Sequence, residues 1–304
     1  MKRIQRGVAA ITAILIVAVA ASAASLMLAQ QAALLDQTML VASRAQADVY
    51  AQAGMEWARG VLLQDMRGSS IDTLDEGWAR PIAGMPIERA VVAGDIADEQ
   101  GKFNLNNVVD GTRRSEADIK LLRQILVAVE LSPELADAVV DWVDGDDDLT
   151  SGSGAESAYY LGLPRPYRAG NAPMVQVDEL YRVRGFDAKA VAKLRPYVTA
   201  IRERTALNMN TASDVVIAAA FGVPRAKVAD LVAERRKNPF ADKAAFIAAA
   251  QRSNLINVLD LVDVKSSWFS VRIQVAQDDV VLGSEALVRR DPKGAAIIWR
   301  RTRY

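Results

Sequence analysis

The chain has 304 residues, with 37 Lys and Arg against 37 Asp and Glu, and it contains neither His nor Cys. The balanced charge gives no electrostatic argument for a nucleic-acid or strongly acidic partner. Without Cys or His there are no disulfides, thiolate zinc sites, cysteine nucleophiles, Ser-His-Asp triads or His-ligated metals. An enzyme would have to rely on carboxylates or Lys, and a chain without Cys fits a protein of the cell envelope.

The N-terminal segment is apolar and follows positive charge. The stretch 7–35 carries no charge, and it is longer than the roughly 20 residues that cross a bilayer. The positive-inside rule places its N-terminus in the cytoplasm. One interpretation is a signal peptide cut near residues 21–23, and another is a retained single-span anchor. The basic residues that precede the stretch are Lys2, Arg3 and Arg6.

A third interpretation comes from the helical pattern, which continues past the membrane length without proline. It predicts one helix from Val8 to about Asp65, about 85 Å long at 1.5 Å per residue. A membrane helix that continues as an amphipathic helix at the start of a chain resembles the type IV pilin family. In that family a prepilin peptidase cuts after the glycine and methylates the new N-terminus. The resemblance therefore implies cleavage between Gly7 and Val8 and methylation of the amine of Val8. Residues 1–7 are then the leader.

The fifth residue after this cut is Thr12, where the pilin family usually has Glu. In related pilins this Glu is thought to pair with the N-terminal amine of a neighbouring subunit. A subunit at the tip of a filament has no further subunit above it. Thr12 therefore narrows the resemblance to a tip subunit, and its hydroxyl is expected to bond back to a helix carbonyl.

The rest of the chain alternates between β and α patterns. Residues 66–86 are rich in turn formers and are predicted to be a loop. Short amphipathic helical segments fill residues 112–261, and several begin with Ser, Thr or Asp caps. Segments with strand patterns lie on both sides of this block, at Ala90–Val92, Gly101–Leu105, 268–277, 280–290 and 295–302.

The strand segments are predicted to pair into one antiparallel sheet packed on the long helix, because neither β portion is large enough alone. The fold class is therefore α+β. An all-α domain (112–261) is inserted into a pilin-like domain made of residues 66–111 and 262–304. The N-terminal helix (8–65) is expected to be part transmembrane and part amphipathic.

The most chemically distinctive stretch is the acidic segment 141–160, DWVDGDDDLTSGSGAESAYY. Oxygen ligands at alternate positions of a flexible loop suit Ca²⁺, and adjacent carboxylates repel one another without a cation. The spacing is not that of an EF-hand, because Leu149 replaces the usual glycine. A solvated acidic turn, a Mg²⁺ site and a paired-carboxylate hydrolase are the alternatives. The predicted calcium ligands are Asp144, Asp146, Asp148, Glu156 and Asp141.

Residues 177–198 and 207–240 have the pattern of helix-hairpin-helix units, and the second resembles competence-type DNA-binding repeats. An envelope-anchored DNA-binding module is therefore the alternative function. In DNA binders the hairpin commonly reads Gly-x-Gly, so that backbone N–H groups approach a phosphate. The second glycine is replaced here by Asp187 in one hairpin and Pro224 in the other. These units are therefore predicted to pack within the protein, with no nucleic acid expected.

Asparagines recur in the motifs N-L-N and N-M-N. Their side chains are predicted to satisfy backbone groups at turns and caps instead of binding a cation. The residues concerned are Asn104, Asn106, Asn107, Asn208 and Asn210.

The order of these motifs along the whole chain resembles the minor pseudopilin K family of type II secretion systems. The residues that carry the resemblance are Arg6-Gly7-Val8, GKFNLNN from Gly101, DWVDGD from Asp141, GAESAYY from Gly154, VDELYRVRG from Val177 and LNMNTA from Leu207. The family implies a non-enzymatic substrate of the prepilin peptidase, single-pass in the inner membrane, with its body in the periplasm. It also implies assembly with I- and J-type minor pseudopilins and other pseudopilus subunits. Such a protein initiates or caps the pseudopilus for protein export across the outer membrane, and calcium would stabilise its inserted domain.

Overall fold

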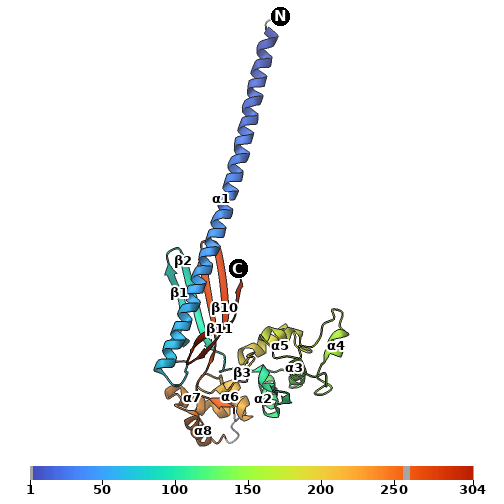
Figure 1. The fold of residues 1–304 in the computed structure, drawn as a ribbon, viewed down its shortest axis with the longest axis vertical. Helices are drawn as coiled ribbons and strands as arrows, with labels where there is room; N and C mark the ends of the chain where they lie inside the picture. The colour runs from blue at the N-terminus through green and yellow to red at the C-terminus, as the bar shows by residue number, and fades with distance from the viewer. Residues whose placement is uncertain (1–2, 256–260, 304) are drawn as a thin grey trace.

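The computed structural model describes residues 3–255 and 261–303. Its most prominent element is a single helix, α1 (Arg3–Gly68), whose N-terminal half extends away from the body (Figure 1). The long helix predicted from the sequence is thus confirmed, and it includes the first three residues of the predicted loop. Within the described residues, only α1 is long and apolar enough to cross a membrane, by length and composition.

The body is built on a five-stranded antiparallel sheet in the order β1-β2-β9-β10-β11. Strand β2 pairs with β9 from Ala90 opposite Gln277 to Asp98 opposite Phe269. Strands from before and after the helical block therefore form one sheet, as the sequence predicted. The strands are β1 (Ile82–Ile87), β2 (Ala90–Asp98), β9 (Trp268–Gln277), β10 (Val280–Asp291) and β11 (Gly294–Arg303).

The edge strand β1 corrects the sequence prediction, which treated residues 66–86 as a loop. Its sequence IAGMPI contains Gly and Pro, which are poor strand formers. An edge strand tolerates both, because one side of it makes no ladder. Gly84 has φ +84° and lies between Ile82 and Met85, where the register with β2 shifts.

The second half of α1 covers the inner face of the sheet. The α1 residues that face the sheet recur every three or four positions and are fully buried, which is the spacing of one helix face. They pack against the inward-pointing side chains of β9 and β10, such as Val271 and Leu282. This buried stripe consists of Ala47, Ala51, Met55, Ala58 and Leu62.

The helical unit lies at the end of the body farthest from the N-terminus (Figure 1). Its core includes Phe103, Leu105 and Val108, and β3 (Phe103–Asn104) pairs with β6 (Val198–Thr199). Residues 103–108 thus pack with the helices, although the sequence assigned them to the sheet domain. Its α-helices are α2 (Glu116–Ala128), α3 (Leu135–Val143), α4 (Ser157–Leu161), α5 (Ala188–Leu194), α6 (Asp214–Phe221), α7 (Ala229–Lys237) and α8 (Lys243–Arg252).

The C-terminal limit of the helical unit also moves. Strand β8 (Val262–Asp263) pairs in parallel with β7 (Leu207–Asn208), and Val264 is buried in the helical core. The sequence placed residues from 262 onward in the sheet domain. A two-residue strand has no sequence pattern that reveals its partner. The sequence therefore could not predict the N-terminal or the C-terminal boundary of the helical unit.

A buried polar network joins the helical unit to the sheet and to the end of α1. The amide of Asn208 donates to the Asp72 carbonyl (3.1 Å), to Asp98 Oδ2 (2.9 Å) and to Ser266 Oγ (2.9 Å). Arg290, 4% exposed, pairs with Asp72 at 2.5 Å. Because the members of this network come from distant segments, they fix the helical unit against the sheet.

The other asparagines of the N-L-N and N-M-N motifs also form hydrogen bonds with backbone groups. Asn104 and Asn106 donate to the carbonyl of Ile201, and Asn107 donates to that of Thr205. The side chain of Asn210 both donates to and accepts from the backbone of Phe240. The prediction that these amides satisfy backbone groups is therefore confirmed.

Candidate metal centre

The acidic segment runs from the end of α3 to the start of α4. Asp141 lies in the last turn of α3, Asp144 is its C-cap residue, and Glu156 precedes α4. Trp142 packs edge-on against Tyr160, with 5.3 Å between the ring centroids. This aromatic contact holds the two helices together and brings the two ends of the loop side by side.

Asp141, Asp144 and Glu156 form what we call the carboxylate cluster. Each offers an oxygen within 4.8 Å of the others, and their exposed fractions are 0%, 4% and 4%. Asp141 Oδ2, Asp144 Oδ1 and both oxygens of Glu156 are buried without a hydrogen-bond donor. Buried acceptors are normally satisfied, because desolvating them otherwise costs free energy. Three buried carboxylates, each with an orphaned oxygen and each offering one oxygen within 4.8 Å of the others, fit a hard cation such as Ca²⁺.

The other two predicted ligands lie outside this buried cluster. Asp146 and Asp148 are exposed, and Asp146 Oδ1 accepts a hydrogen bond from the Asp148 amide at 2.9 Å. The alternating acidic pattern therefore shapes the turn at the mouth of the cluster. The structure brings together three of the five predicted residues.

Three residues that sequence reasoning did not identify also belong to this site. The guanidinium of Arg114 lies 3.1 Å from Asp144 and donates to the Asp148 carbonyl at 2.6 Å. Asn171 donates to the Asp146 carbonyl at 2.9 Å, and its own Oδ1 is buried without a donor. A Cβ on Gly154 would overlap the Asp141 carboxylate. None of the three lies within the run of alternating acids, so no spacing signal pointed to them.

The electrostatics of the cluster favour protons or a cation. Burial, followed by the charges of Asp141 and Asp144, raises the pKa of Glu156 to about 8. Burial also raises the pKa of Asp144 to about 6, although a hydrogen bond from Arg114 opposes this shift. A divalent cation would stabilise the ionised carboxylates against both causes of the raised pKa values, which are burial first and repulsion between the acids second.

A second group of acids, Asp65, Asp72 and Glu76, is already neutralised by the protein. Arg290 lies 2.9 Å from Asp65 and 2.5 Å from Asp72. Glu76 Oε2 accepts from the amide of Thr73 and the indole of Trp78. Burial and the charge of Glu76 raise the pKa of Asp65 to about 6. Because these acids have donors, this group does not call for a cation.

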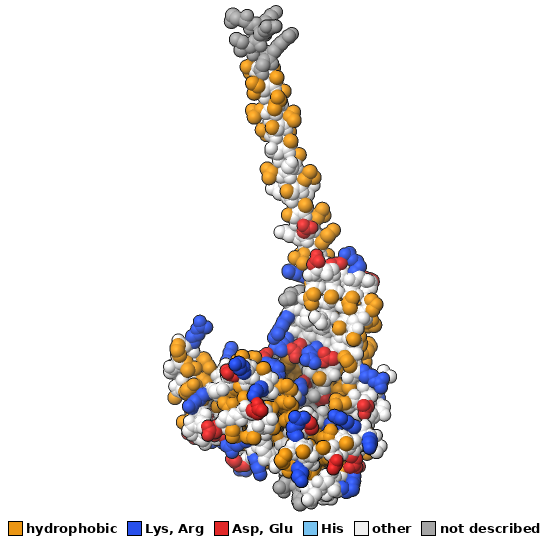
Figure 2. Space-filling model, turned by 180° about the vertical axis from the view of Figure 1, so that it is seen from behind, with side chains coloured by type: hydrophobic (Ala, Val, Ile, Leu, Met, Phe, Trp, Pro, Cys, Tyr) orange, Lys and Arg blue, Asp and Glu red, His pale blue; other side chains and the backbone are white. Residues whose placement is uncertain are grey.

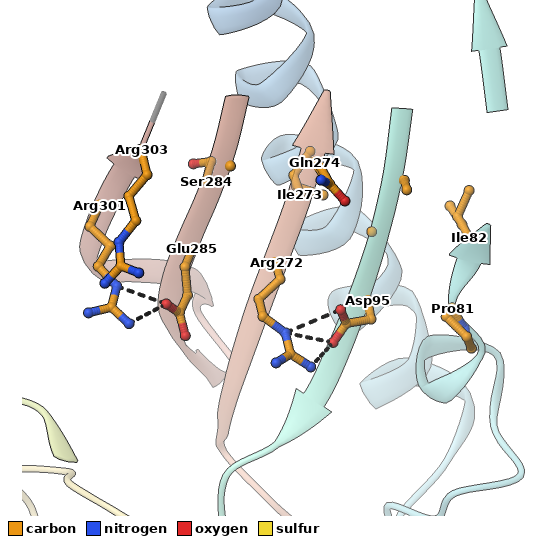
Figure 3. Close-up of a pocket in the computed structure, with 13 residues that line it drawn as sticks. Pro81, Ile82, Asp95, Arg272, Ile273, Gln274, Ser284, Glu285, Arg301 and Arg303 are labelled. Atoms are coloured by element: carbon orange, nitrogen blue, oxygen red, sulfur yellow. Dashed lines mark hydrogen bonds and ion pairs between the residues drawn. The ribbon is translucent and has the colours of Figure 1, made fainter. Parts of the chain in front are cut away.

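The outer face of the sheet, opposite α1, carries a row of paired charges (Figure 3). Asp95 accepts from Arg272 on the next strand, and Arg301 pairs with Glu285 at 2.6 Å. These four residues stand opposite one another in the strand register. The four charges alternate in sign, and Arg303 also lines the cavity of about 400 Å³ above them.

The two hairpins use their polar groups within the protein. Asp187 Oδ1 accepts from the Ala190 amide at 2.7 Å and so caps α5. In the second hairpin, the amides of Gly222 and Val223 donate to carbonyls of α6. These contacts agree with the prediction that the hairpins are packing units.

The processing residues lie in the first turns of α1. The hydroxyl of Thr12 donates to the Val8 carbonyl at 3.1 Å and to the Ala9 carbonyl at 3.0 Å. The predicted back-bonding of this hydroxyl is therefore present, and Thr12 is accommodated in an apolar helix without a partner.

Comparison with known proteins gives a consistent family assignment. The family described as Type II secretion system (T2SS), protein K, matches residues 101–203 and 207–272. A Type II secretion system protein K from Pseudomonas aeruginosa is 33% identical over 81% of this chain and 77% of its own length. Another, from Aeromonas hydrophila, is 29% identical over 98% and 97%.

A solved structure shares the fold. A chain of the GspK-GspI-GspJ complex from the type 2 secretion system of enterotoxigenic Escherichia coli superimposes with a TM-score of 0.76 and 22% identity. The match covers 88% of this chain and 99% of the other. The fold of the matched part of this chain is thus one already seen in a chain of a solved complex.

Proposed function

Since the chain belongs to the type II secretion system protein K family, we propose that it is a minor pseudopilin at the tip of the pseudopilus. It assembles there with I- and J-type minor pseudopilins, and it initiates or caps the filament for protein export across the outer membrane. The observation that carries this proposal is the family match together with the free half of α1. A structural relative forms a complex with GspI and GspJ.

The N-terminal half of α1 anchors the protein in the inner membrane, and the body lies in the periplasm. The apolar side chains of this half of α1 are exposed, and the helix extends away from the body (Figure 2). Basic residues precede the apolar stretch, which supports a cytoplasmic N-terminus. Prepilin peptidase removes residues 1–7, and the methylated Val8 becomes the first residue.

Thr12 supports a place at the tip. A carboxylate inside a bilayer is costly by roughly 2.5–3.5 kcal/mol on insertion scales and is retained only with a partner. A tip subunit lacks the neighbour that would supply this partner. A hydroxyl that bonds to its own helix, as that of Thr12 does, has no such requirement. Thr12→Glu is therefore expected not to improve secretion.

The carboxylate cluster holds a structural Ca²⁺, with Asp141, Asp144 and Glu156 as its protein ligands. The ion neutralises buried charge and fixes the loop between α3 and α4, and it supplies no reactive group. The proposal rests on the orphaned oxygens and the raised pKa values of Glu156 and Asp144. The role of the protein is thus structural and non-catalytic.

The proposed function is tested by determining the N-terminus and mass of the mature chain isolated from membranes. The expected product begins with methylated Val8 and copurifies with I- and J-type minor pseudopilins. A chain that begins near Ala24 would be a secreted product of signal peptidase, and this result would overturn the assignment. An unprocessed chain would equally contradict it.

A further inference from the structure

A groove in the helical unit lies between α2 and the second hairpin, which follows α6. Its volume is about 540 Å³, within the range of cavities that hold ligands. Ala218 and Ala219 of α6 line it, together with Pro224 of the hairpin. Val127 of α2 also lines it, and this side chain is 59% exposed. We call it the distal groove, because α2 and α6 lie at the end of the body farthest from the N-terminus (Figure 1).

The hairpin and α2 fix the shape of the distal groove. Gly222 ends α6 with φ +66°, a left-handed conformation that glycine adopts readily. A Cβ at this position would lie 2.8 Å from Gln124 Nε2, so the glycine also lets α2 pack closely against the hairpin. The amides of Gly222 and Val223 donate to the carbonyls of Ala219 and Ala218, at 3.1 and 3.0 Å. The groove is therefore preformed, and these two backbone donors are not free to bind a phosphate.

The charged residues that line the distal groove are all cations. They are Lys120, Arg123 and Arg225, and no acid is among the described lining residues. Arg123 pairs with Asp137 at 2.6 Å, and the Asp137 side chain is only 8% exposed. Arg225 pairs with Asp214 at 2.6 Å, outside the lining. Lys120 is exposed, and in the part of the chain that the structure describes no acid pairs with it. The uncompensated charge of the groove is therefore positive.

We propose that the distal groove binds an extended peptide segment of the exported protein, with an acidic side chain at Lys120 and an aliphatic side chain against Val127. The inference rests on the proposed function, because the tip of the pseudopilus is the end that faces the exported protein. The aliphatic side chain covers Val127 and the alanines of α6, which removes apolar surface from water. The acid compensates the charge of Lys120.

The spacing of the two contacts on α2 sets the pattern of the bound segment. Lys120 and Val127 both line the groove and belong to one helix. Their separation is about two helical turns, so the two side chains lie on the same side of α2, about 10 Å apart along its axis. An extended segment rises about 3.3 Å per residue. The acid and the aliphatic residue of the segment are therefore expected three positions apart.

Two other classes of ligand fit the distal groove less well. A nucleic acid would present phosphates, which are commonly bound by backbone amides, but the hairpin amides are used within the protein. A lipid headgroup belongs to the opposite end of the molecule, where the N-terminal half of α1 extends (Figure 1). A peptide with acidic and aliphatic side chains uses both the positive charge and the apolar floor of the groove.

The first test measures export by cells whose only copy of the full-length chain carries one substitution. Lys120→Glu reverses the charge of the groove, whereas Lys189→Glu makes the same change on α5, outside the lining. Ala128→Trp fills the groove, whereas Ala226→Trp adds the same bulk to the hairpin outside it. All four positions are exposed, so the fold should tolerate each change, and thermal melting verifies this.

We expect K120E and A128W to reduce export of the exported protein at least tenfold, and both controls to leave it within twofold. Copurification of the I- and J-type subunits should be unchanged in all four variants, because the groove lies away from α1. This readout separates loss of the groove from loss of the assembled tip.

Cross-linking identifies the occupant, because the chain contains no Cys. A photoreactive maleimide is attached to Val127→Cys, and to Gln274→Cys on the outer sheet face as the control (Figure 3). During export, the label at residue 127 should join the exported protein at a segment with the expected spacing of acid and aliphatic residue. Replacing the acid of that segment by Lys should restore export by K120E.

Four results would overturn the inference and leave the proposed function intact. They are adducts of residue 127 with an I- or J-type subunit instead of the exported protein, equal labelling from residues 127 and 274, equal loss of export in K120E and K189E, and no rescue by the reversed charge. An adduct with DNA, or an unmodified chain that does not copurify with I- and J-type pseudopilins, would contradict the inference and the proposed function together.

Discussion

Glu156→Gln should make the metal-free protein more stable at alkaline pH and abolish most of its response to calcium. Two unit charges 4.8 Å apart repel by about 3.5 kcal/mol at an effective dielectric of 20. Glu156 lies within this distance of both Asp141 and Asp144. Arg114, 3.1 Å from Asp144, already offsets part of the repulsion. We therefore expect a net gain of about 2–4 kcal/mol when all the acids are ionised.

The sign of the pH dependence follows from the raised pKa values. Glu156 has a pKa of about 8 in the folded protein against an ordinary 4.5, and Asp144 about 6 against 3.8. A raised pKa means that the folded state keeps a proton which the unfolded chain releases. This stability is fully present below the ordinary pKa and is lost as the pH rises through about 8. The metal-free wild type and E156Q should thus melt together at acidic pH and diverge in alkali.

Calcium should act in the opposite direction, since it binds the ionised cluster. A ligand at 100 times its Kd stabilises by about 2.7 kcal/mol. This corresponds to a rise in Tm of about 4 °C for a chain of 304 residues. The assay is thermal melting of the full-length chain in detergent, with chelator or with calcium, at acidic and alkaline pH. The reasoning fails if E156Q without metal melts below the wild type in alkali, or if calcium stabilises E156Q as much as the wild type.

Two further predictions concern buried contacts of Arg290 and Gly154, and a third concerns DNA binding. Arg290→Met should lower stability by about 3–5 kcal/mol in urea, because Asp65 and Asp72 would lose their buried partner; Arg289→Met, which breaks an exposed pair with Glu203, should change it by at most about 1 kcal/mol. Gly154→Ala should weaken calcium binding at least tenfold in titration calorimetry, whereas Gly152→Ala, which has open space around it, should not. The full-length chain should not bind DNA in gel-shift assays at two salt concentrations. DNA binding whose affinity falls steeply with salt would support the DNA-binding alternative instead.

Most of the secondary structure was predictable because it depends on neighbouring residues. The period of apolar side chains identified α1, and alternation identified β9, β10 and β11 almost to the residue. Strand β1 was missed, because Gly and Pro weaken its local pattern and only pairing with β2 makes it a strand.

The candidate metal centre was only partly predictable. The high density of acidic residues in 141–160 indicated a metal site. This density does not distinguish the exposed Asp148 from the buried Asp141. Arg114 lies 30 residues before Asp144 in the chain and reaches it only because the fold brings them together. For the two hairpins the sequence was sufficient, because Asp187 and Pro224 already argued against phosphate binding.

By itself, the sequence determined the long apolar helix, the order of strands and helices, and the motifs that place the chain in its family. These properties depend on contiguous residues, because helix and strand periods, caps and turns extend over only a few positions. Only the tertiary structure decided which acids converge and where the two domains meet. Those features depend on where the chain returns in space, and no period along the sequence records that path.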